Sequence, residues 1–168
     1  MKKPYVIWLT GLAGSGKSTI GRALYEKLKR ECENIIYLDG DELRELLGHY
    51  GYDKQGRIDV ALKRSQFAKF LNDQGMIVVV TTISMFDEIY KYNRENLNNY
   101  FEIYIKCPME ELIARDQKEL YTKALNSEIK NVVGVDIKYD EPNAHFVLDN
   151  SMQENLDEKV EMIIKQLL

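Results

Sequence analysis

Near its N-terminus the chain reads Gly11-Leu12-Ala13-Gly14-Ser15-Gly16-Lys17-Ser18, a match to the pattern G-x-x-x-x-G-K-[ST]. A continuous apolar run over residues 5–10 precedes this segment, and apolar residues recur at helical spacing over residues 17–31. A buried strand, a glycine-rich turn and a helix in this order present backbone N–H groups and a helix N-terminus to phosphate oxygens. The segment therefore predicts a binding site for a nucleoside triphosphate.

Each residue type in this loop has a physical role. Lys17 places a positive charge on the β- and γ-phosphates, and the hydroxyl of Ser18 is a ligand for the magnesium ion that phosphoryl transfer requires. We therefore expect ATP and Mg²⁺ as cofactors. The residues expected at the ATP phosphates are Gly11, Ala13, Gly14, Ser15, Gly16, Lys17, Ser18 and Thr19. For Gly14 and Thr19, an ordinary turn or helix role is an equal alternative.

Strand-like and helix-like segments alternate along the rest of the chain. Further strands are predicted over residues 34–38, 76–82, 101–106 and 145–149, and helices over residues 42–47, 58–75, 109–115 and 156–167. Such alternation is typical of a parallel sheet whose ligands bind beyond the carboxyl ends of the strands. We predict an α/β, three-layer P-loop kinase fold, with a mainly parallel five-stranded sheet, helices on both faces and a lid segment. Its 168 residues suit one domain over 1–168.

Composition excludes several partners. The 23 basic and 27 acidic residues give a net charge of −4, so no net positive field is available to hold a nucleic-acid backbone. No apolar run approaches the roughly 20 residues of a membrane helix, and a cytoplasmic enzyme is expected. Cys32 and Cys107 lack metal-ligand spacing and predict reduced thiols. The choice between monomer and homodimer stays open.

Two carboxylates follow the second predicted strand in the sequence Asp39-Gly40-Asp41. A carboxylate at this strand end lies beside the phosphate loop, where it can hold magnesium indirectly or accept the proton of an attacking hydroxyl. The third strand ends in Val80-Thr81-Thr82 without the acidic residue of a Walker B motif. We therefore assign the catalytic and metal-binding carboxylate to Asp39, and Asp41 is a candidate cap for the following helix.

Two longer motifs resemble those of the adenylylsulfate (APS) kinases. Leu38-Asp39-Gly40-Asp41-Glu42-Leu43-Arg44 resembles the LDGDxxR element of that family. Arg115-Asp116-Gln117-Lys118-Glu119-Leu120-Tyr121-Thr122-Lys123-Ala124 resembles its later R-D-x-K-x-L-Y-x-K-A pattern, and Ile129-Lys130 and Val133-Gly134 follow in the same order. The resemblance extends from about residue 5 to residue 148. It implies a kinase that phosphorylates the 3′-hydroxyl of a nucleotide.

The resemblance also implies an acceptor site. It places the acceptor nucleotide at Asp41, Arg44, Tyr52, Arg57, Ile83 and Ser84. Arg57 corresponds to a residue that binds the anionic end of the acceptor, and Tyr52 stands in place of a phenylalanine that stacks on its base. Ser84 corresponds to a serine sometimes described as a phosphorylated intermediate, although we favour direct in-line transfer. Core packing for Tyr52 and solvated surface charges for Arg44 and Arg57 are the alternatives.

The segment 115–134 corresponds to a mobile lid that folds over the ATP phosphates and excludes water. Within it, the resemblance assigns Arg115 and Lys118 to ATP, and it assigns Lys118, Leu120, Tyr121 and Lys130 to the acceptor. The alternative for these lysines is an ordinary charged surface.

Two departures from the family pattern concern the acceptor. Val60 replaces an asparagine that hydrogen-bonds the acceptor, and Ile83-Ser84-Met85-Phe86-Asp87 replaces I-S-P-[YF]-R. Lost polar contacts usually indicate a different substrate. The variant pattern resembles the APS-kinase-like enzymes of bacterial capsule pathways, which phosphorylate the ribose 3′-hydroxyl of cytidine diphosphoramidate. The alternatives are an APS kinase that makes PAPS in sulfate assimilation and a non-catalytic nucleotide-binding module.

Overall fold

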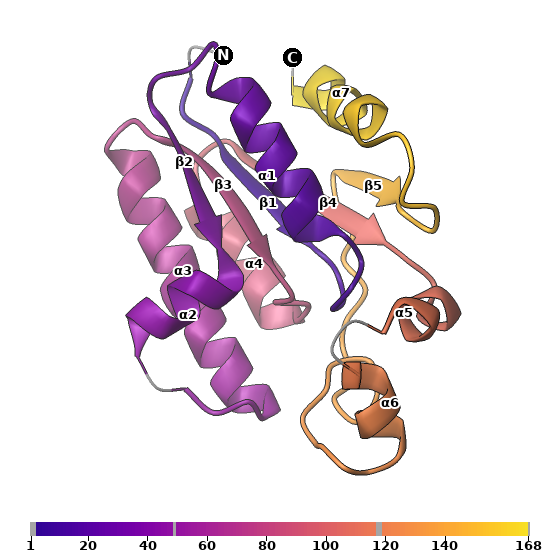
Figure 1. Ribbon diagram of the computed structural model, residues 1–168. Coiled ribbons are helices and arrows are strands. Elements are labelled where there is room, and N and C mark those ends of the chain that lie inside the picture. The colour runs from indigo at the N-terminus through magenta and orange to yellow at the C-terminus, as the bar shows by residue number, and fades with distance from the viewer. Residues whose placement is uncertain (1–2, 49, 117–118, 168) are drawn as a thin grey trace.

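The computed structural model describes residues 3–48, 50–116 and 119–167. Its five strands are β1 (Val6–Thr10), β2 (Ile35–Asp39), β3 (Ile77–Thr82), β4 (Tyr100–Lys106) and β5 (Phe146–Asp149). They form one sheet in the order β2-β3-β1-β4-β5, and all neighbouring pairs are parallel (Figure 1). The predicted α/β fold with a five-stranded parallel sheet is confirmed.

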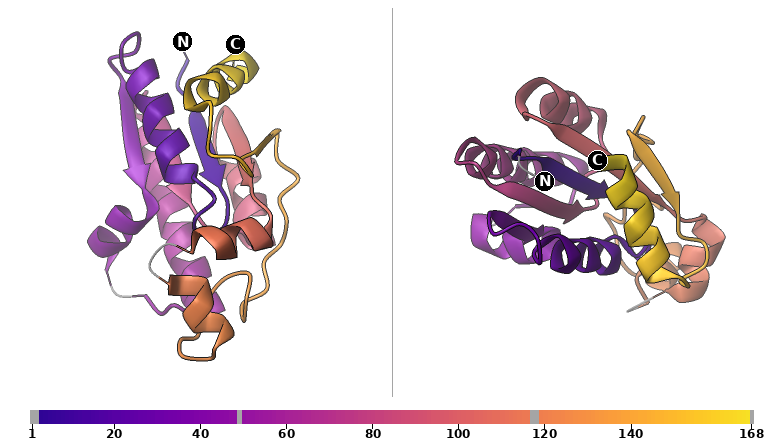
Figure 2. Two further views of the ribbon diagram at one scale, coloured as in Figure 1. Left: turned by 45° about the vertical axis from the view of Figure 1, so that its right-hand side comes forward. Right: turned by 90° about the horizontal axis from the view of Figure 1, so that it is seen from above.

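Helices cover both faces of the sheet. Helices α1 (Lys17–Leu28) and α7 (Leu156–Leu167) lie on one face, and α3 (Lys54–Asp73) and α4 (Asp87–Asn96) lie on the other (Figure 2). Successive side chains of a strand point to opposite faces. Along β1, Val6 and Trp8 therefore join the core under α3 and α4, while Ile7 and Leu9 join the core under α1 and α7. None of the described helices is long and apolar enough to cross a membrane.

Three short helices lie at the end of the sheet where the strands terminate: α2 (Gly40–Leu47), α5 (Met109–Arg115) and α6 (Leu120–Leu125) (Figure 1). Helix α6 belongs to the segment for which we predict a lid. The glycine-rich loop also leaves β1 at this end. The architecture thus gathers the candidate functional segments at one edge of the sheet, as parallel strands require.

Two predicted helix starts are wrong. Asp41 does not cap the helix after β2: α2 begins at Gly40, and Asp39 is its N-cap, accepting hydrogen bonds from the N–H groups of Asp41 (2.9 Å) and Glu42 (3.4 Å). The chain turns directly from strand into helix at position 40. A Cβ there would lie only 2.7 Å from the carbonyl oxygen of Thr81, so this turn requires glycine. Helix α3 begins at Lys54, about one turn before the predicted start.

Candidate active site

The glycine-rich loop has a conformation that depends on its glycines. Gly14 and Gly16 have φ angles of 80° and 94°, in the left-handed region that L-residues with a Cβ rarely adopt. A Cβ on Gly16 would also lie 2.3 Å from Nδ2 of Asn150, and a Cβ on Gly11 would lie 2.6 Å from the carbonyl oxygen of Ile105. The close packing of loop against sheet therefore excludes larger residues at these positions.

Asn150, which directly follows β5, supports the loop from behind. Its side chain is buried, and its Nδ2 donates to the carbonyl oxygen of Ser15 (2.7 Å). Its Oδ1 accepts from Nζ of Lys159 on α7 (2.6 Å). Sequence reasoning missed Asn150 because it belongs to no local motif and lies 135 residues from its partner.

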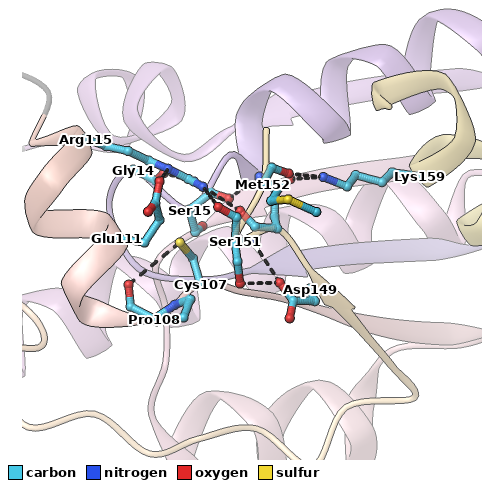
Figure 3. Close-up of polar contacts among 11 residues, drawn as sticks. Gly14, Ser15, Cys107, Pro108, Glu111, Arg115, Asp149, Ser151, Met152 and Lys159 are labelled. Carbon is cyan, nitrogen blue, oxygen red and sulfur yellow. Dashed lines mark hydrogen bonds and ion pairs between the residues drawn. The ribbon is translucent and has the colours of Figure 1, made fainter. Parts of the chain in front are cut away.

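Arg115, predicted to bind the ATP phosphates from the lid, contacts the outer side of the loop. Its side chain is 8% exposed and forms an ion pair with Glu111 (3.0 Å). It donates to the carbonyl oxygens of Gly14 (3.3 Å), Asn150 (2.7 Å) and Ser151 (2.7 Å), as Figure 3 shows. In this conformation Arg115 joins α5 to the loop and to the segment after β5, and its contact with ATP stays a prediction.

Three further predicted lid residues, Leu120, Tyr121 and Lys130, lie outside the cavity wall described below. Tyr121 is buried and its hydroxyl donates to the carbonyl oxygen of Ala13 (2.6 Å), so α6 is attached to the phosphate loop. Leu120 packs against the core, and Lys130 is exposed. Lys118 lies outside the described residues.

One cavity joins the phosphate loop to the predicted acceptor residues. It encloses about 600 Å³ including the open space at its mouth. Its wall is formed by Lys17, Ser18, Asp39, Gly40, Asp41, Arg44, Tyr52, Arg57, Val60, Arg64, Thr81, Thr82, Ile83, Ser84, Phe86 and Val133. All six residues assigned to the acceptor outside the lid are therefore in the same wall as the donor-site lysine.

Asp39 is held in this wall by four hydrogen-bond donors. Besides the two amides that it caps, its Oδ2 accepts from the hydroxyls of Tyr37 and Thr81, both at 3.3 Å. Burial alone would raise the pKa of this carboxyl, but the hydrogen bonds outweigh burial and hold the pKa below its ordinary value. Asp39 is therefore an ionised carboxylate at neutral pH.

Lys17 and Ser18 occupy the donor end of the cavity. Burial lowers the pKa of the Lys17 ammonium, while the carboxylates of Asp41 and Asp39 oppose this shift. The Ser18 side chain is exposed at the start of α1. Mg²⁺ commonly binds one or two protein oxygens and completes its shell with water and phosphate oxygens. The Ser18 hydroxyl and the Asp39 carboxylate line one cavity and fit this requirement.

Three side chains form the outer acceptor wall. The Tyr52 ring is 60% exposed, and the guanidinium carbons of Arg44 and Arg57 lie 4.2 Å and 5.6 Å from its centroid. Arg44 donates to the carbonyl oxygen of Gly51 (2.6 Å), and Arg57 donates to that of Asn131 (2.7 Å). Tyr52 is thus not packed in the core, and the arginines are fixed by backbone oxygens.

The two sequence departures have different positions. Val60 is 2% exposed and contributes an apolar surface to the wall. Asp87 is not part of the wall; it begins α4, and its N–H donates to the Asp140 carboxylate (3.1 Å). Asp87 thus forms no part of this wall, and its effect on the acceptor stays a prediction. Sequence reasoning also missed Arg64, which lines the same cavity. The one indication in the sequence is that Arg64 follows Val60 by four residues, a spacing that places both on one face of a helix.

A parallel sheet in this strand order, a glycine-rich phosphate loop after β1 and a carboxylate at the end of the nearby strand β2 define the class of P-loop kinases. The cavity between loop and carboxylate leaves room for an acceptor.

Comparisons with known proteins specify the family. The adenylylsulphate kinase family profile matches residues 3–149. A cytidine diphosphoramidate kinase from Campylobacter jejuni is 74% identical over 164 residues, which cover 98% of this chain and 96% of the relative. An adenylyl-sulfate kinase from Pseudomonas aeruginosa is 37% identical over 169 residues, covering 99% and 86%. The Mycobacterium tuberculosis APS kinase, solved in complex with AMPPNP and APS, superimposes with a TM-score of 0.88 at 30% identity over 99% of both chains.

The chain belongs to the adenylylsulphate kinase family. It is accordingly a kinase that uses ATP, and the resemblance inferred from its motifs is confirmed.

Proposed function

We propose that this kinase transfers the γ-phosphoryl group of ATP to the ribose 3′-hydroxyl of cytidine diphosphoramidate, as a cytoplasmic step in the biosynthesis of phosphoramidate-modified capsule polysaccharide. The observation that carries the proposal is the single cavity in which Lys17 and Ser18 meet Asp39 and the acceptor arginines. The choice of acceptor rests on the Campylobacter jejuni relative, which is named for it.

On the donor side, the loop N–H groups and Lys17 bind the ATP phosphates and stabilise the charge of the transferring group. Bound Mg²⁺ would neutralise phosphate charge, held by Ser18 directly and by Asp39 directly or through water. Arg115 and Tyr121 keep the loop in place through the carbonyl oxygens of Gly14 and Ala13.

On the acceptor side, Asp39 orients the 3′-hydroxyl toward the γ-phosphorus. The new bond joins the 3′-oxygen to that phosphorus, the bond to the bridging oxygen of ADP breaks, and the hydroxyl proton passes to Asp39 or to water. Because its pKa is held low, Asp39 is a weak base, and orientation is its main contribution.

Ser84 contributes an acceptor contact in this mechanism. Its Oγ lies 2.8 Å from Oγ1 of Thr82 and 3.1 Å from Nη1 of Arg64. Neither neighbour is a base that could activate a serine nucleophile. Direct transfer from ATP to the acceptor therefore fits these contacts better than a phosphoserine intermediate.

Specificity for the acceptor follows from the chemistry of the wall. Tyr52 offers an aromatic face to the base, and Arg44 and Arg57 face the diphosphate-like bridge. Val60 provides no hydrogen bond, which suits an acceptor with a neutral terminal amide in place of a sulfate.

The test is a phosphorus NMR assay of ATP with cytidine diphosphoramidate, adenylylsulfate and CDP in parallel. We expect a new phosphomonoester resonance, assigned to the 3′-position, to form fastest with cytidine diphosphoramidate. Lys17→Met is the control for transfer at this site, and Lys63→Met, an exposed lysine of α3, is the matched charge control.

Faster turnover of adenylylsulfate would instead favour an APS kinase. Failure to phosphorylate any of the three nucleotides would favour a non-catalytic binding module.

A further inference from the structure

The cavity wall contains a buried cation, Arg64, to which the mechanism above assigns no role. Arg64 lies on α3 four residues after Val60, and both side chains line the cavity. Residues at this spacing share one face of a helix. Arg64 is only 4% exposed, so α3 places a full positive charge in the interior wall of the acceptor site.

Every hydrogen-bond partner of Arg64 is neutral. Its Nη1 donates to Oγ1 of Thr82 (2.8 Å) and to Oγ of Ser84 (3.1 Å), and its Nη2 donates to the carbonyl oxygen of Gly40 (2.9 Å). Its buried Nε–H has no partner among the described residues. Within the same part of the chain, Arg64 forms no ion pair with a carboxylate.

Arg64 nevertheless remains charged. Burial, with a smaller contribution from Arg44, lowers the pKa of its guanidinium to about 10, which is still well above neutrality. The negative charges of Asp41 and Asp39 partly counter this lowering of the pKa, but they act on Arg64 through space and not through a hydrogen bond. A buried charge without a close counter-charge is costly, and such arrangements are concentrated at functional sites.

The neighbours of Arg64 increase the need for an anion. Arg44 and Arg57 are also held by backbone carbonyl oxygens and form no ion pair within the described ranges. The Ser84 hydroxyl, a predicted acceptor contact, touches the Arg64 guanidinium directly. A phosphate oxygen bound at Ser84 would therefore lie close to the charge of Arg64.

We propose that Arg64 is a specificity-determining residue that supplies the buried positive charge for the phosphate bridge of the acceptor nucleotide. The proposal deepens the proposed function and rests on it only in requiring an anionic nucleotide as acceptor. Val60 offers no polar contact, and Arg64, one turn further along the helix, provides a charge on the same side of the cavity.

The experiment compares wild type with Arg64→Met, which removes the charge at similar length, and with Arg64→Lys, which retains it. Lys63→Met removes a charge from the exposed neighbouring position and is the matched control. NMR titrations measure the affinities for CDP, for neutral cytidine and for Mg·ATP separately, and thermal melts establish that each variant is folded. These binding measurements require no turnover.

We expect Arg64→Met to weaken CDP binding on the order of tenfold to hundredfold, the loss associated with a charge-assisted hydrogen bond. Cytidine and Mg·ATP should bind within about twofold of wild type, since neither places a phosphate at Arg64. Arg64→Lys should lose less CDP affinity than Arg64→Met, and Lys63→Met should match wild type.

Unchanged CDP affinity in Arg64→Met, or no CDP binding by the wild type, would overturn the inference. Equal losses for CDP, cytidine and Mg·ATP would assign Arg64 a purely structural role and would also overturn it. The proposed function fails separately: if the wild type does not phosphorylate cytidine diphosphoramidate but Arg64→Met still weakens CDP selectively, Arg64 serves another anionic nucleotide.

Discussion

Asp39 caps a helix and is also the carboxylate to which we assign a catalytic task. Its Oδ1 caps α2, while its Oδ2 accepts from Tyr37 and Thr81 beside the cavity. Asparagine caps helices about as well as aspartate, whereas alanine does not. The two tasks can therefore be separated by two substitutions at the same position.

We expect Asp39→Asn to lower kcat on the order of 10²-fold to 10³-fold, because the negative charge that orients the acceptor hydroxyl is lost. Stability should change little, since the cap is retained. Asp39→Ala should show the same loss in kcat and an additional loss of about 1 kcal/mol in the free energy of unfolding. Steady-state kinetics and urea unfolding measure the two effects.

Titration with Mg·ATP is the control for both Asp39 variants, and the affinity should stay within a few-fold of wild type. Near-normal kcat in Asp39→Asn would reject the role assigned to this carboxylate.

At the level of single residues, the sequence predicted the side chains that belong to local motifs. Lys17 and Asp39 each follow a strand within a recognisable pattern, so their position beside the cavity could be inferred. Asn150 and Arg64 could not be found in this way. Asn150 meets the loop only because β5 and β1 end at the same edge of the sheet, and the role of Arg64 depends on how α3 packs against β3.

At the level of secondary-structure elements, short apolar runs predicted the five strands of the described chain. The apolar run is continuous in β1 and β3, which are buried on both faces. Helix starts were less predictable. The start of α2 depends on the packing of Gly40 against Thr81, which no sequence pattern records.

Strand β4 contains a buried acid far from the cavity wall. Glu102 has no exposed side-chain surface, and its carboxylate accepts from Arg94 on α4 (2.7 Å) and from the Tyr100 hydroxyl (2.5 Å). Its backbone N–H donates to Nδ1 of His145 (2.9 Å). Burial raises the pKa of Glu102, although the Tyr100 hydrogen bond and the charges of Arg94 and His145 act in the opposite direction.

This shift predicts a pH dependence of stability. The folded-state pKa lies above the ordinary value of 4.5, so the folded state binds the proton more tightly than the unfolded state. The resulting stability is present below the unfolded pKa and is lost as pH rises through the folded pKa. Relative to Glu102→Gln, the free energy of unfolding of wild type should therefore decrease as pH rises above about 4.5.

Urea unfolding of both proteins over a series of pH values measures this difference. Glu33→Gln, which removes an exposed carboxylate before β2, is the matched control. A difference that grows in favour of wild type with rising pH would contradict the assignment.

For the whole molecule, the net charge is negative, whereas the charge of the cavity wall is positive. The chain carries −4 overall, yet the cavity wall contains Lys17, Arg44, Arg57 and Arg64 against only two carboxylates, Asp39 and Asp41. The composition argued against a nucleic-acid surface, but it could not predict a cationic pocket. The positions of these charges depend on the folded chain, and they fit the two anionic nucleotides that the proposed function requires.

Because we assign donor and acceptor to different ends of one cavity, we expect each to stabilise the folded protein separately. A ligand at 100 times its Kd adds about 2.7 kcal/mol, and for a chain of this size about 1 kcal/mol raises Tm by about 2–4 °C. Mg·ATP alone and CDP alone should thus each raise Tm by about 5–10 °C. Lys17→Met should lose the increase with Mg·ATP and keep the increase with CDP. Arg64→Met should keep the increase with Mg·ATP, and at the same CDP concentration its increase with CDP should fall to about half of the wild-type increase or less. Thermal melts of these variants beside Lys63→Met measure both effects, and loss of both increases in either variant would show that the two ends of the cavity do not bind independently.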